Sequence, residues 1–82
     1  MITFTPRGTC SRQIIFDLAE DNTIHNVKFM GGCNGNLQGI GRLIDGMDAA
    51  DAITRLRGID CNMKGTSCPD QLAKALEAAL AQ

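Results

Sequence analysis

Four cysteines are the residues of this chain best suited to chemistry: Cys10, Cys33, Cys61 and Cys68. Clustered thiols in a reducing compartment are typical of metal binding or of redox activity. The chain has no Cys-x-x-Cys pair, so it lacks the motif of zinc ribbons and of thioredoxin-like dithiols. The spacing alone leaves two interpretations open. The thiols form a metal or redox cluster, or they are four separate buried side chains that act as small apolar residues.

Each cysteine lies at a junction between expected elements. Cys10 follows the first strand, Cys33 lies between a hairpin and the first helix, Cys61 follows the second helix, and Cys68 stands at the start of the last. Junctions of this kind can meet at one end of a two-layer domain. Tetrahedral binding of one Zn²⁺ by four thiolates is the simplest use of such a set. We therefore predict a zinc site with these four ligands, which would also stabilise a small core.

Other chemistry is less well supported by the residue types. A thiol in the first turn of a helix, such as Cys68, also suits a nucleophile or a redox centre. A nucleophile normally needs a base, and the single histidine, His25, lies within an expected strand. We therefore predict no catalytic residue. The glycine-rich loop 31–36 either offers backbone N–H groups to an anion or lets the backbone turn Cys33 inward.

The elements that position these residues follow from apolar periodicity. Alternating and β-branched runs predict strands at 2–5, 12–18 and 24–30, the last two joined as a hairpin. Helical spacing predicts a first helix that ends near Gly46, a second at 49–57, and a third that follows residue 67. The fold class is α+β: a two-layer sandwich in which an antiparallel sheet of two or three strands precedes three helices packed on one face.

Details of the helices can be predicted as well. The first helix should bury the apolar residues that recur at helical spacing, which are Leu37, Ile40, Leu43, Ile44 and Met47. Asp48 is placed to cap the second helix. Ser67 and Asp70 have the spacing of a capping box at the start of the third, and Pro69 falls in its first turn.

Length and charge exclude several classes of protein. A chain of 82 residues, 44% hydrophobic and without Trp or Tyr, suggests a single domain, 1–82, with a small core. A net charge of −1 argues against nucleic-acid binding. No apolar run is long enough to span a membrane. The N-terminus does not resemble a signal peptide, so we expect a cytoplasmic protein.

Residues 66–70 spell Thr-Ser-Cys-Pro-Asp, the motif after which the TSCPD-domain family is named. The chain resembles the small stand-alone members of that family over nearly its whole length. Blocks 5–11, 31–36, 58–61 and 66–73 carry the resemblance. The family is similar to a C-terminal region of cobalamin-dependent ribonucleotide reductases. The resemblance implies that the cysteines of the four blocks bind metal.

Three functions are consistent with these observations. The first is a small zinc-binding accessory or interaction domain whose partner is an unidentified protein, with ribonucleotide reductase or a second copy of the chain as candidates. The second is a redox-active thiol protein linked to deoxynucleotide synthesis, in which Cys61 and Cys68 or another pair cycle. The third is a metal-free structural adaptor. A chain of this size cannot enclose a reductase active site, so we expect no enzyme activity from the chain alone.

Overall fold

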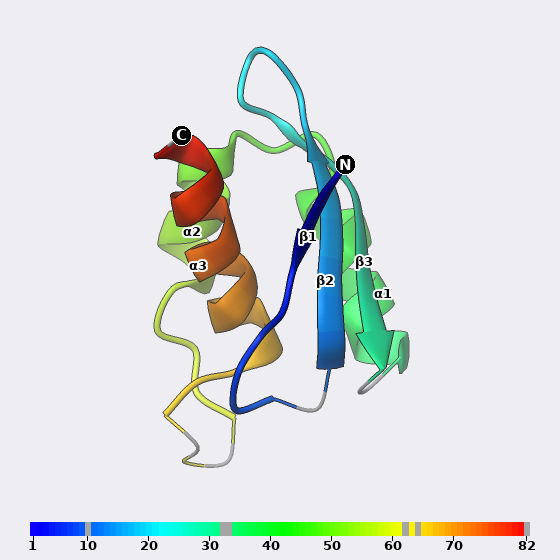
Figure 1. The fold of residues 1–82 in the computed structure, drawn as a ribbon, viewed down its shortest axis with the longest axis vertical. Coiled ribbons are helices and arrows are strands. Elements are labelled where there is room, and N and C mark those ends of the chain that lie inside the picture. The colour runs from blue at the N-terminus through cyan, green and yellow to red at the C-terminus, as the bar shows by residue number, and fades with distance from the viewer. Residues whose placement is uncertain (10, 32–33, 62, 64, 82) are drawn as a thin grey trace.

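The computed structural model describes residues 1–9, 11–31, 34–61, 63 and 65–81. A three-stranded antiparallel sheet with strand order β1-β2-β3 is followed by three helices (Figure 1). The elements are β1 (Ile2–Phe4), β2 (Ser11–Leu18), β3 (Ile24–Gly31), α1 (Asn34–Ile44), α2 (Ala49–Leu56) and α3 (Cys68–Leu80). The predicted α+β fold is therefore confirmed. None of the described helices has the length and apolar character that a membrane span requires.

One face of the sheet forms the core with the helices. Ile14 and Phe16 of β2 and Ile24 of β3 are fully buried. Leu72 and Leu76 of α3 are buried in the same cluster. Successive strand residues point to opposite faces, so the strand residues that alternate with these buried ones lie on the uncovered face of the sheet. Burial of these apolar side chains is the main favourable contribution to folding.

The contact between β3 and α1 depends on an irregularity in β3 near Asn26 and on a glycine in α1. The β2–β3 register shifts between Ile15 and Asp17, and Asn26 has a positive φ of 56°. The backbone N–H of Asn26 donates to the Asp45 carboxylate at 2.9 Å, just after α1. A Cβ atom at Gly41 would lie 3.0 Å from the Val27 carbonyl oxygen. Gly41 therefore allows α1 to lie close against β3, although glycine weakens a helix.

The prediction that Leu43 is buried was wrong. The helix packs through Leu37, Gly41 and Ile44, which are buried, whereas Leu43 is 80% exposed. One residue along a helix turns the side chain by about 100°, so Leu43 falls outside the narrow stripe that reaches β3. As predicted, α1 ends before Gly46, which has a φ of 82°.

The expected side-chain cap of α2 is also absent. Asp48 is the N-cap residue, but its side chain makes no capping hydrogen bond. Asp48 instead forms an isolated antiparallel bridge with Thr23, and the Ala49 N–H donates to the Asn22 carbonyl oxygen at 2.8 Å. The turn before β3 thus bonds one of the amides that a helix start leaves unpaired.

Candidate functional site

The described residues that flank the four cysteines in sequence lie at one end of the molecule. This end holds the segment that follows β1, the start of β2, the end of β3, the described part of the connection between α2 and α3, and the start of α3 (Figure 1). Ser11, beside Cys10, pairs across the sheet with Gly31 near the end of β3. The Ser11 Oγ lies 3.1 Å from the Cys68 Sγ. These contacts join three of the four segments directly.

The fourth segment, which carries Cys61, is joined to the start of α3 by a backbone hydrogen bond. The Cys61 N–H donates to the Thr66 carbonyl oxygen at 3.0 Å, so the exposed cysteine lies close to the start of the segment 66–70. Beside this bond, the Asp60 carboxylate accepts from the Gly65 N–H at 2.8 Å. Cys61 itself is exposed, whereas Cys68 is buried with 8% of its surface accessible.

Cys68 is held at the first position of α3. The preceding Ser67 is the N-cap, and its Oγ accepts from the Asp70 N–H at 3.1 Å. Pro69 fits the first turn because that position requires no backbone donor. A helix N-terminus stabilises negative charge, so this position suits a thiolate. The predicted start of the last helix is thereby confirmed.

Ser11 was not singled out by the sequence. It is buried, with 4% of its surface accessible, and its Oγ also lies 3.4 Å from the Thr9 Oγ1. Either the hydroxyl or the thiol can donate in the Ser11–Cys68 contact. A thiolate can only accept, so the Ser11 hydroxyl would donate to Cys68 whenever the sulfur is deprotonated. The one sequence signal was that Ser11 directly follows a cysteine.

Asp70 has a larger role than the predicted capping box. It is 3% exposed, and its carboxylate accepts from the Thr66 Oγ1 at 2.5 Å and from the Gly58 N–H at 2.7 Å. The Thr66 hydrogen bond is the main reason that the pKa of Asp70 lies below its ordinary value. The Gly58 N–H and the Lys74 ammonium, 3.6 Å away, lower this pKa further. The motif thus ties the loop that bears Cys61 to the helix that bears Cys68.

Gln71, directly after the motif, connects this network to the N-terminal segment. Its Nε2 donates to the Thr66 Oγ1 at 3.0 Å, and its Oε1 accepts from the Arg7 N–H at 3.1 Å. Gly8 has a φ of 74°, and a Cβ there would lie 3.1 Å from the Thr66 methyl group. The segment that leads to Cys10 therefore packs against the motif.

Two of the four predicted ligands, Cys10 and Cys33, lie outside the described residues, as do Gly32 and the side chain of Asn34 in the glycine-rich loop. Within the described part of the chain, no three His, Cys, Asp or Glu side chains are grouped as a metal site would require. His25 lies near the other end of β3, where its Nε2 is 2.8 Å from the Thr23 Oγ1.

A family model for the TSCPD domain matches residues 2–80. The chain belongs to the TSCPD-domain family. Comparisons with curated proteins and with solved structures gave no match. The signature of this TSCPD domain has a clear structural basis: Thr66 and Asp70 bond to each other, Ser67 caps α3, and the Cys68 thiol at the start of that helix is buried.

Proposed function

We propose that this TSCPD domain binds one Zn²⁺ through Cys10, Cys33, Cys61 and Cys68 and serves as a small accessory or interaction domain. The observation that supports the proposal best is the 3.1 Å contact between Ser11 and Cys68. It brings the neighbour of one cysteine, 57 positions away in sequence, against the sulfur of another. Gly31, near the third cysteine, pairs with the same serine.

The chemistry of the described groups is compatible with zinc. Metal ligands are usually oriented by outer hydrogen bonds, and a buried hydroxyl beside the Cys68 sulfur can supply one. Four thiolates with no open position form a structural rather than a catalytic zinc site. Such a metal contributes to folding because the unfolded chain has no preformed site. A cross-link between the sheet and α3 suits a domain with a small core.

The direct test is metal content. The full chain should be purified without an affinity tag that binds metal, and zinc and protein should then be quantified by elemental analysis. We expect about one zinc per chain, and replacement of each cysteine by serine in turn should lower the content. Protein without zinc that also fails to bind added Zn²⁺ would refute the proposal. Reversible loss of thiols under oxidant in zinc-free protein would favour the redox alternative.

The accessory role rests on the family. Its similarity to a C-terminal region of cobalamin-dependent ribonucleotide reductases supports a partner of that kind for this TSCPD domain. A binding assay between the zinc-loaded chain and such a reductase is the relevant measurement. Binding that does not respond to removal of zinc would separate the interaction from the metal.

A further inference from the structure

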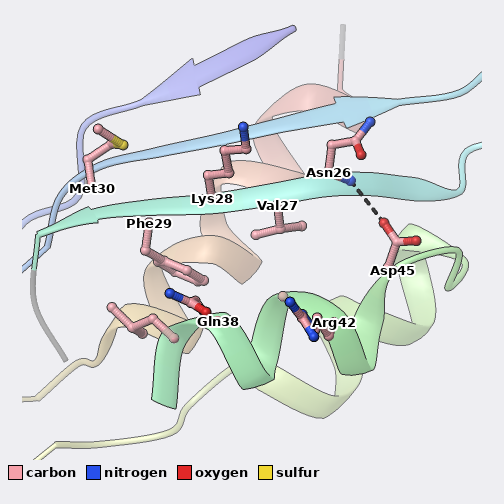
Figure 2. A pocket seen from close by; sticks show the side chains of 10 residues that line it. Asn26, Val27, Lys28, Phe29, Met30, Gln38, Arg42 and Asp45 are labelled. Atoms are coloured by element: carbon pink, nitrogen blue, oxygen red, sulfur yellow. Dashed lines mark hydrogen bonds between the residues drawn. The ribbon is translucent and has the colours of Figure 1, made fainter. Parts of the chain in front are cut away.

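A groove runs between the outer edge of β3 and helix α1 (Figure 2). Its volume is about 580 Å³, and five consecutive residues of β3, 26–30, line it. Val27 and Phe29 point toward α1, where Gln38 and Arg42 form the other side (Figure 2). A strand that lines a groove with consecutive residues presents its backbone edge to it, since its side chains alternate between faces.

The N-terminal part of this edge, at 24–26, already forms hydrogen bonds within the chain. The Ile24 N–H donates to the Met47 carbonyl oxygen at 2.9 Å, and the Ile24 carbonyl oxygen accepts from the Gly46 N–H at 2.6 Å. The Asn26 N–H is bonded to Asp45. At Val27 the carbonyl oxygen faces Gly41 of α1. From 28 to 31, the backbone is paired with β2, and no hydrogen bond joins it to another described element. Unpaired donors and acceptors on an edge strand can bond to another strand.

Two cations lie on opposite sides of this open edge. Lys28 is paired with Ile15 and points away from α1, whereas Arg42 belongs to α1 (Figure 2). Both side chains are exposed, and neither forms an ion pair with a described residue. The carboxylate in the groove, Asp45, is already bonded to a backbone N–H. An added strand would place acidic side chains beside a cation on either of its faces.

We propose that this groove binds an extended acidic segment of a partner protein, which adds to the sheet along β3. Its backbone bonds to the open edge at 28–31, and its carboxylates pair with Lys28 and Arg42. Its apolar side chains contact Val27 and Phe29. The acidic character follows from charge complementarity, since neither Lys28 nor Arg42 forms an ion pair within the described part of the chain. This interaction is independent of the zinc site.

The test uses the full chain labelled with ¹⁵N and a short acetylated and amidated peptide that repeats Val-Glu-Glu-Val, so that Glu lies on both faces of the extended strand. We expect saturable binding by fluorescence anisotropy, with amide shift changes concentrated in 27–31 and α1. Lys28→Glu and Arg42→Glu should each weaken binding by up to about fivefold, the range of an exposed ion pair. Arg55→Glu, an exposed arginine of α2, is the matched control and should leave the affinity unchanged.

A second peptide tests the backbone contribution. It has the same side chains and charge, but alternate amides are N-methylated, so it cannot pair with an edge strand. We expect its binding to be lost. Equal binding of the two peptides, or a peptide with Lys for Glu that binds as tightly, would overturn the proposal. Absence of binding would overturn it as well. So would a dimer in analytical ultracentrifugation whose β3 edge is covered, because a second copy of the chain would then be the occupant.

Discussion

The end of the TSCPD domain that holds residues 66–71, called the motif end, and the β3–α1 groove differ in how far their polar side chains are buried and paired. At the motif end, Thr66, Asp70 and Gln71 are buried and bonded to one another or to backbone amides. In the groove, Lys28 and Arg42 are exposed and without ion partners among the described residues. Buried polar groups that satisfy each other stabilise the fold, whereas exposed charges contribute little to it. The first region is thus suited to hold the proposed zinc site, and the second is suited to bind the proposed partner.

The largest effect should come from the thiol at the centre of the motif. Cys68→Ser should lower the free energy of unfolding of the zinc-loaded protein by at least about 3 kcal/mol, because a structural metal contributes directly to folding. His25→Ala, at the other end of β3, should cost less than about 1 kcal/mol. Chemical denaturation in the presence of zinc measures both. Similar midpoints for Cys68→Ser and the parent protein would contradict a structural metal.

Removal of the buried carboxylate should be the next largest effect. Asp70→Ala leaves the Thr66 hydroxyl and the Gly58 N–H without their acceptor and should cost about 3 kcal/mol. Asp51→Ala is the matched control, since Asp51 also lies in the first turn of a helix but is exposed. Its cost should stay below about 1 kcal/mol. Urea denaturation of the zinc-free proteins isolates this contribution from the metal.

A substitution in the groove should have a much smaller effect on stability than one in the motif. Arg42→Glu should change stability by less than about 0.5 kcal/mol in the same assay, since the side chain is exposed. An equal loss of stability for Asp70→Ala and Arg42→Glu would remove the distinction between a structural motif and a surface available to a partner.

Ser11→Ala should moderately weaken zinc binding and leave the stability of the zinc-free protein unchanged. We expect zinc affinity to fall by about 10- to 100-fold, the range observed for loss of an outer hydrogen bond to a ligand. Competition with a chromogenic chelator measures it, and the sulfur-to-metal charge-transfer band of the Co²⁺ form should shift. Ser11→Thr keeps the hydroxyl and should restore most of the affinity. A loss of stability without any change in affinity would make Ser11 a packing residue only.

The smallest effect should be the pH dependence of Asp70. The pKa of this group is lower in the folded state than its ordinary value of 3.8. The folded state therefore binds fewer protons in this range, and the stabilisation is complete above about pH 4. It is lost as pH falls through the folded pKa. In zinc-free protein, the acid loss of stability should be shallower for Asp70→Asn than for the parent. Parallel curves would show that other carboxylates, such as Asp17 and Asp21, dominate.

Much of the fold followed from local patterns. The three strands and three helices lie within a few residues of their predicted bounds, because alternation, helical spacing and the Ser67 cap act between near neighbours. Local patterns failed at Leu43 and at the Asp48 side chain, which are decided by where α1 meets β3 and where the turn before β3 meets α2. The zinc ligands Cys10, Cys33, Cys61 and Cys68 remain a prediction.

By itself, the sequence determined the order of the elements, the position of cysteines at their junctions and membership of the TSCPD family. Only the tertiary structure decided that Ser11 contacts Cys68 across 57 positions, and that Arg7 bonds to Gln71 across 64. The same holds for the bonds between Asp70 and the Gly58 amide and for the open edge of β3. The physical reason is range: propensities and caps act over one turn, whereas these contacts require the sheet and α3 to be packed first.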